Sequence, residues 1–172
     1  MALGDHLLST GMGYTFLSAL AGAVALIVLM AGAEALLSGQ DLQRWLASLK
    51  KPKLYAPMAL WIVVAIATYF LQGVIAYRLL SGAIDVADWI AFAALVTVMA
   101  ANVAYNVVLA RRQEPRVAYT GIIYFVFPLA FLQVALFFAD PPSAFLNLIY
   151  LAWVVGYDVP IMRAVWKLNA ST

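Results

Sequence analysis

The sequence predicts an all-α fold, a polytopic membrane protein whose five helices form a single bundle over residues 1–172. Hydrophobic residues make up 66% of the chain and charged residues 10%, whereas a soluble domain has about half apolar and about a quarter charged residues. Five apolar stretches also reach the roughly 20 residues that a helix needs to cross the hydrocarbon core. We place these spans at residues 14–37, 56–80, 89–109, 117–138 and 145–162.

The first span follows an N-terminal segment that carries Asp5 and His6 but no Lys or Arg. A cleavable signal peptide begins with basic residues, so we expect this span to be retained in the protein. Glu34 lies near the far end of the span, and we interpret it as a charge at the membrane interface.

The connection after the first span, residues 38–55, is the longest one. Leu42, Trp45, Leu46 and Leu49 recur in it at intervals of three and four residues, which is typical of a short amphipathic helix. Pro52 disfavours the helical conformation at the preceding residue. We therefore expect a surface helix that ends before Pro52.

The remaining connections, residues 81–88, 110–116 and 139–144, are short, which makes sequential helices antiparallel neighbours. Pro141 and Pro142 cannot continue a helix and are expected to set the start of the last span. Pro160, near the end of that span, removes a backbone donor and would free the carbonyl of Gly156.

The basic residues predict how the bundle is oriented. Nine of the ten Lys and Arg residues fall on the side of the first loop, the third loop and the C-terminus, and only Arg78 falls on the other side. Short cytoplasmic loops carry such an excess, so the N-terminus is predicted outside and the C-terminus in the cytoplasm. The nine residues are Arg44, Lys50, Lys51, Lys53, Arg111, Arg112, Arg116, Arg163 and Lys167. Because they flank spans, they indicate contact with a lipid surface and give no argument for nucleic acid.

Polar residues within the spans are costly to place in lipid, so each one is a candidate functional residue. Antiparallel threading places Asp158 in the same half of the membrane as Asn102, Tyr105 and Asn106, and the two asparagines share a helix face. One reading is a polar lining at the mouth of an inward-opening cavity, and the other is interhelical hydrogen bonding. Asp158 favours the first reading, because no basic residue is expected at its depth. Gln72 and Gln133 are interpreted as packing contacts.

Several kinds of site lack the residues that they need. The chain has no cysteine and one histidine, His6, outside the spans, so a haem held by histidine within the bundle is excluded. Axial methionine from Met30, Met58, Met99 or Met162 stays open. No His or carboxylate cluster indicates a metal, and no set of nucleophile, base and orienting group indicates covalent catalysis.

The aromatic residues fall into two groups. One group lies near span ends, as amphipathic rings in membrane proteins do. Tyr69, Tyr105, Trp153 and Tyr157 lie further in, where they either form core contacts or contact a flat conjugated ligand.

Several motifs resemble those of the TspO/MBR family, the translocator proteins and tryptophan-rich sensory proteins. The sequence RWLASLKKP at 44–52, followed by Pro57, is similar to the Trp-Tyr-Ala-Gly-Leu-Lys-Lys-Pro stretch of that family. In the same order along the chain, further matches are YFLQG at 69–73, NVAY at 102–105, ARRQ at 110–113, YLAW at 150–153 and WKLN at 166–169.

This resemblance implies a five-helix bundle, commonly dimeric, with a cavity that is covered by the first loop and that binds porphyrins or other flat hydrophobic molecules. It puts Trp45, Pro52 and Pro57 in the lid. It puts Tyr69, Asn102, Tyr105, Trp153 and Tyr157 on the cavity wall. Our reading of the polar residues adds Asn106 and Asp158 to that wall. The chain departs from the family pattern with Ala65 in place of a Trp, and with Tyr157 and Asp158 in place of small residues, which would make the cavity smaller and more polar.

Three functions remain open. The first is a membrane protein that binds, transports or senses a flat hydrophobic ligand, such as a porphyrin or a haem-type tetrapyrrole. The second is an accessory subunit of a membrane complex or a homodimer, favoured by Ser18 and Gly22, small residues four apart that permit close helix packing. The third, an enzyme with Asp158 as acid or base, has only one carboxylate to support it. A sterol ligand rests on a loose pattern of Val155, Tyr157 and Arg163.

Overall fold

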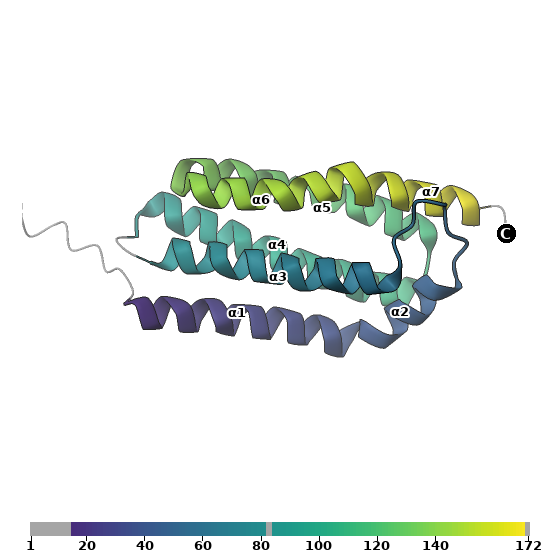
Figure 1. Ribbon diagram of the computed structural model, residues 1–172, viewed down its shortest axis with the longest axis horizontal. Helices are drawn as coiled ribbons and strands as arrows, with labels where there is room; N and C mark the ends of the chain where they lie inside the picture. The colour runs from purple at the N-terminus through teal and green to yellow at the C-terminus, as the bar shows by residue number, and fades with distance from the viewer. Residues whose placement is uncertain (1–14, 82–83, 171–172) are drawn as a thin grey trace, which may run out of the picture.

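The computed structural model describes residues 15–81 and 84–170, so Asp5 and His6 lie outside the described residues. Figure 1 shows the helices as a bundle of long, nearly parallel rods with one short helix at the end. Their bounds are α1 (Phe16–Leu37), α2 (Gly39–Ser48), α3 (Met58–Leu80), α4 (Val86–Arg112), α5 (Pro115–Ala139), α6 (Pro141–Trp153), the π-helical turn η1 (Val154–Asp158) and α7 (Val159–Asn169).

The five predicted spans are confirmed within the described part of the chain. Helices α1, α3, α4 and α5, and the continuous stretch Pro141–Asn169, are long and apolar enough to cross a membrane. Large side chains on their outer faces remain exposed, among them Phe70, Phe127 and Phe138, for which 68–75% of the surface is accessible. Such a surface is stable in contact with lipid, and the protein is an integral multi-pass membrane protein.

The helix that contains the last predicted span, residues 145–162, is longer than that span at both ends. The helix begins at Pro141, because proline is well suited to the first turn, where its missing N–H would have no intrahelical partner. It continues past residue 162 to Asn169, because the polar residues of α7 form its final turns.

The other connections are also shorter than predicted, since residues that were assigned to loops cap the helices instead. Asp85 and Asp88 form a reciprocal capping box at the start of α4, with both hydrogen bonds 3.0 Å long. Helix α5 starts directly after Glu114, and Asp140 alone separates α5 from α6.

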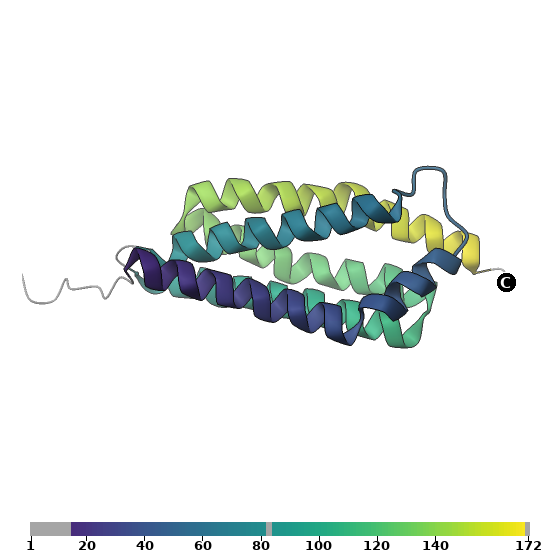
Figure 2. The same cartoon turned by 60° about the horizontal axis from the view of Figure 1, so that its bottom comes forward.

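The arrangement of the helices follows from these tight links. The antiparallel helices α4 and α5 pack together, and α5 also packs along α6 and α7. Helix α1 lies beside α3 and also contacts α4. Helix α2 turns away from the end of α1 and crosses the end of the bundle against α4, as Figures 1 and 2 show. The predicted amphipathic surface helix is therefore confirmed.

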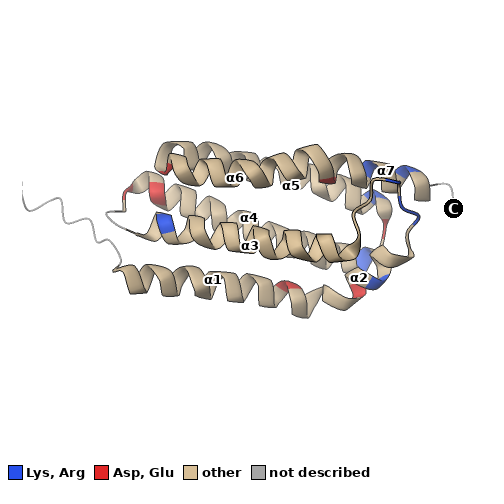
Figure 3. Ribbon diagram, viewed as in Figure 1, with Lys and Arg blue, Asp and Glu red and all other residues tan. Residues whose placement is uncertain are grey.

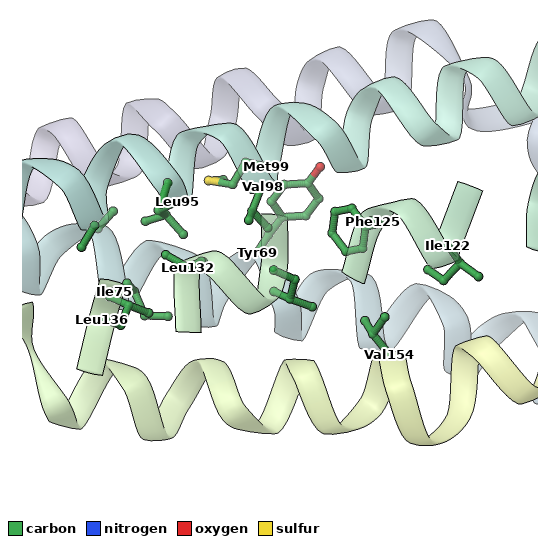
Figure 4. Packing of buried hydrophobic residues seen from close by; sticks show 14 of the residues in the cluster. Tyr69, Ile75, Leu95, Val98, Met99, Ile122, Phe125, Leu132, Leu136 and Val154 are labelled. Atoms are coloured by element: carbon green, nitrogen blue, oxygen red, sulfur yellow. The ribbon is translucent and has the colours of Figure 1, made fainter. Parts of the chain in front are cut away.

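The densest packing lies in the half of the bundle away from α2. The largest fully buried side chains come from the second halves of α3 and α5 and from the first half of α4, and Figure 4 shows several of them meeting. They include Ile75, Leu79, Leu95, Met99, Leu129, Leu132 and Leu136. The half nearer to α2 is less completely filled, and the cavity described below lies there.

Charge is distributed unequally between the two ends of the bundle. Figure 3 shows Lys and Arg gathered at the end that carries α2 and α7. At the opposite end, Arg78 forms a bidentate ion pair with Asp140, with N–O distances of 2.7 and 2.9 Å. The Arg78 guanidinium holds the pKa of the Asp140 carboxyl below its ordinary value. The single basic residue of that end is thus neutralised by a partner.

Candidate ligand cavity

A cavity of about 530 Å³ lies between α1, α3 and α4, beneath α2. A second chamber of about 130 Å³ adjoins it and extends toward α6. The lining of both chambers is mainly apolar. The volume of the larger chamber is within the range of about 300–1,000 Å³ that is usual for small-molecule sites. The residues that line both chambers are Glu34, Trp61, Ala65, Tyr69, Tyr105, Asn106, Ile122 and Asp158.

Helix α2 covers the larger chamber with one face. Leu42, Gln43 and Leu46 line the chamber, while Trp45 packs into the hydrophobic core, with 7% of its surface exposed. Trp45 therefore anchors the helix in the core, and its neighbours on the same amphipathic helix face the cavity.

The loop from α2 to α3 is fastened to the last span at two points. The side-chain amide of Asn169 accepts a hydrogen bond from the Lys50 N–H at 3.1 Å and donates one to the Lys50 carbonyl at 3.0 Å. The Tyr157 hydroxyl accepts a hydrogen bond from the Ala56 N–H at 2.7 Å and donates one to the Leu54 carbonyl at 2.8 Å. These bonds hold residues 50–56 over the bundle.

The two prolines belong to this same loop. Pro52 lies between the two attachment points, and Pro57 is the N-cap residue of α3. Neither residue lines the two chambers. Their fixed φ angles restrict the loop and the start of α3.

Glu34 is the residue whose role the sequence did not indicate. Its carboxylate accepts a hydrogen bond from the Tyr69 hydroxyl at 2.6 Å and another from the Asn102 side-chain amide at 2.9 Å. The interpretation as a simple interfacial charge was wrong, since the two donors draw the side chain into the bundle, where it lines both chambers. These donors lie 35 and 68 residues away, so no local pattern could reveal the contact.

Tyr105 and Asn106 contribute to the cavity from α4. The Tyr105 hydroxyl donates to the Ala118 carbonyl of α5 at 2.9 Å. Its ring lies against Gly121, where an added Cβ would stand 2.5 Å from a ring carbon. Only glycine allows this close approach, which fixes the ring as part of the wall. Asn106 lines both chambers one position further along.

Asp158 reaches the cavity through an irregular turn. The Val159 N–H bonds to the Val154 carbonyl, five residues back, which defines the π-helical turn η1. Pro160 has no N–H to offer to the carbonyl one turn earlier, and a π-turn just before it widens the helix at this point. Asp158 lines both chambers, and 8% of its surface is exposed.

Four aromatic rings, from Tyr55, Trp61, Trp153 and Tyr157, form a cluster next to the loop and the cavity. The centroids of Trp153 and Tyr157 are 4.5 Å apart, and Trp61 lies 6.3 Å from Trp153 and 5.9 Å from Tyr157. Tyr55 lies 5.7 Å from Trp61. Trp61 was not singled out from the sequence because it lies close to the start of a span, where an interfacial ring is expected.

Three buried polar atoms near this cluster have no hydrogen-bond partner among the described residues: the Tyr55 hydroxyl, the Trp61 indole nitrogen and one carboxylate oxygen of Asp158. Burial raises the pKa of the Tyr55 phenol to about 12, so its hydroxyl keeps its proton. Unsatisfied buried polar groups are rare in native proteins and call for an explanation. A polar group of a bound ligand would explain all three atoms, because it could hydrogen-bond with the two donors and with the carboxylate oxygen.

The structure divides the residues that the sequence singled out into two groups. Tyr69, Asn102, Tyr105, Asn106, Trp153 and Asp158 line one or both chambers. Trp45, Pro52, Pro57 and Tyr157 lie in or hold the covering segments. Within residues 15–81 and 84–170, no three His, Cys, Asp or Glu residues are grouped so as to hold a metal ion.

Comparison with known proteins agrees with this architecture. The model of the TspO/MBR family matches residues 23–159, which include most of α1 and every element from α2 to η1. The search of curated proteins gives no match. Because the family match spans most of the 172 residues, it identifies the chain: this membrane protein belongs to the TspO/MBR family.

Proposed function

We propose that the protein binds a flat hydrophobic molecule, such as a porphyrin or another tetrapyrrole, and transports or senses it. The observation that carries the proposal is the apolar cavity of about 530 Å³ beneath α2. A conjugated ring system buries its faces best against apolar and aromatic side chains. Trp61, Tyr69 and Tyr105 offer such faces.

The covering segments support a binding cycle in which the cavity opens at one end. Helix α2 lies over the cavity, and the loop 49–57 that follows it is held by a small number of hydrogen bonds at Lys50, Leu54 and Ala56. A few such bonds can break and reform without unfolding of the bundle. If the basic end faces the cytoplasm, as the charge pattern predicts, the ligand enters from that side or from the inner leaflet.

A second candidate function is that of a subunit that packs against another membrane protein or a second copy of itself. Two hollows of about 270 and 330 Å³ lie between α4 and α5, and small residues of α4, Ala93, Ala94, Ala101 and Ala104, line them beside larger side chains. Small residues let helices approach closely in membranes. Gly22, one of the pair Ser18 and Gly22, already packs against Leu80 within the chain, since a Cβ added at Gly22 would lie 3.3 Å from a Leu80 side-chain carbon. The surface of α4 and α5 is therefore better suited to this role.

The two functions are separated by purification in mild detergent, followed by an absorption spectrum and a titration with protoporphyrin IX. A co-purifying chromophore, or saturable quenching of tryptophan fluorescence, supports ligand binding. Absence of quenching, together with a stoichiometric protein partner, would support the subunit role instead.

A further inference from the structure

The cavity contains two carboxylates and no cationic side chain among the described residues that line it. Glu34 and Asp158 line both chambers, and the lining includes neither Lys nor Arg. Within residues 15–81 and 84–170, the ion pairs are Arg44 with Asp41 and Arg78 with Asp140. Neither cavity carboxylate therefore has a positive partner in the part of the chain that the structure describes.

The two carboxylates differ in what they have left to offer. Glu34 uses one oxygen, Oε2, for both Tyr69 and Asn102, so its other oxygen is available to a ligand. Only 8% of the surface of Asp158 is exposed. Its oxygen Oδ1 is buried and accepts no hydrogen bond from the described residues. A carboxylate oxygen accepts hydrogen bonds and cannot donate them when ionised. Asp158 Oδ1 therefore lacks a donor among the described residues, and Glu34 has an oxygen left to accept one.

The rings of the cavity add a second and independent preference for positive charge. Trp61, Tyr69 and Tyr105 line both chambers, and Tyr150 and Trp153 line the inner one. The face of an aromatic ring attracts an ammonium group, most strongly where water is excluded. Negative carboxylates and aromatic faces together favour an amine cation, and they disfavour a carboxylate on the ligand, which would lie beside like charges.

We propose that the ligand of this cavity carries a protonated amine on its flat hydrophobic body, and that the amine lies between Glu34 and Asp158. The inference rests on the proposed function and narrows it, since it names the polar group of the ligand. It predicts that the cavity prefers a cationic amphiphile to a ring system whose polar groups are carboxylates.

The test uses one macrocycle in three charge forms. The probes are protoporphyrin IX, which carries two carboxylates, its neutral dimethyl ester, and its bis-amide with N,N-dimethylethylenediamine, which carries two ammonium groups. Binding to the purified full-length protein in a non-ionic detergent is followed by quenching of tryptophan fluorescence. We expect the affinity of the ammonium form to be at least about tenfold higher than that of the free acid, and the affinity of the ester to lie between the two.

The carboxylates are then removed one at a time. Asp158→Asn and Glu34→Gln should each weaken binding of the ammonium form by about tenfold or more and leave binding of the ester nearly unchanged. Glu114→Gln removes the same charge from an exposed position outside the cavity and should change none of the three affinities. The two cavity variants lie on different helices, so a folding defect in one leaves the other informative.

The possible outcomes distinguish the two proposals. Two results would contradict the proposal of a cationic ligand and leave the proposed function unaffected. One is that the free acid binds most tightly, and the other is that the ammonium form binds both cavity variants as tightly as it binds the wild type. If none of the three forms shows saturable quenching, the proposed function fails and this inference fails with it.

Discussion

At the scale of single residues, the polar groups inside the bundle work in two different ways. Some satisfy one another across helices, as Asn147 and Gln133 do at 2.9 Å on α6 and α5. This pair confirms the reading of Gln133 as a packing contact. Others keep an unused oxygen or N–H that faces the cavity, as Glu34, Trp61 and Asp158 do. The first kind stabilises the bundle, and the second kind is available to a ligand.

The hydrogen bond from Tyr69 to Glu34 joins two helices and also holds a carboxylate that lines the cavity. Its contribution to stability can be tested by removal of one oxygen atom. Tyr69→Phe deletes the donor and leaves the carboxylate with Asn102 alone. We expect the free energy of unfolding to fall by about 1.5–3 kcal/mol, as for other hydrogen bonds to charged groups. The measurement is denaturant or thermal unfolding in detergent. Tyr124→Phe, at a ring that is 73% exposed, is the control and should have little effect; equal effects of the two changes would contradict this role.

The ion pair between Arg78 and Asp140 predicts a dependence of stability on pH. The pKa of Asp140 is lowered in the folded protein, so the pair stabilises the fold above the ordinary aspartate pKa of about 4 and loses this effect as the pH falls through the lower folded value. Wild type should therefore be more stable than Asp140→Asn at pH 7, and the difference should shrink as the pH falls below the ordinary aspartate pKa of about 4. A difference that stays constant over that range would show that the charge plays no part.

At the scale of the elements, the sequence predicted best what depends on local periodicity. The intervals between Leu42, Trp45 and Leu46 were enough to predict α2. Helix ends were predicted less well, because Asp85 and Glu114 were assigned to loops and instead cap the starts of α4 and α5. The π-turn at Asp158 was missed, since Pro160 indicates only that a backbone bond is lost and not how the helix adjusts.

The covering segment gives a prediction at this scale. Tyr157→Phe removes both bonds that hold the loop at Leu54 and Ala56, and Pro52→Gly gives the same loop more backbone freedom. If the loop retains the ligand, each change should speed dissociation of protoporphyrin IX several-fold, since a hydrogen bond contributes about 0.5–1.5 kcal/mol. Stopped-flow displacement measures this rate, with Tyr124→Phe as the control. Rates equal to wild type in both loop variants would argue against a lid.

At the scale of the whole molecule, the hydropathy of the chain specified the five spans, and the family motifs indicated which helices enclose the cavity. The lining itself depends on contacts between distant parts of the chain, such as Glu34 with Asn102. The same holds for the approach of Tyr105 to Gly121. Such pairs follow from helix packing, which a single sequence does not specify.

The orientation of the bundle in the membrane is predicted from charge alone. The chain has no cysteine, so single cysteines can be placed at the two ends: Glu114→Cys between α4 and α5, and Val86→Cys at the start of α4. We expect an impermeant thiol reagent to label Val86→Cys in intact cells and Glu114→Cys only after the membrane is opened. The reverse pattern would show that the basic end faces outward.

The central claim is that a flat ligand occupies the cavity beneath α2, and a volume test addresses it most directly. Ala65 lines both chambers, whereas Ala67, two residues along α3, is exposed and lines neither. A phenyl ring at position 65 would occupy space that the ligand needs, so Ala65→Phe should weaken binding of protoporphyrin IX or its ammonium form by about tenfold or more, with the thermal midpoint retained. Ala67→Phe should bind as wild type does. Equal affinities of the two variants, measured by tryptophan quenching, would show that the ligand binds elsewhere.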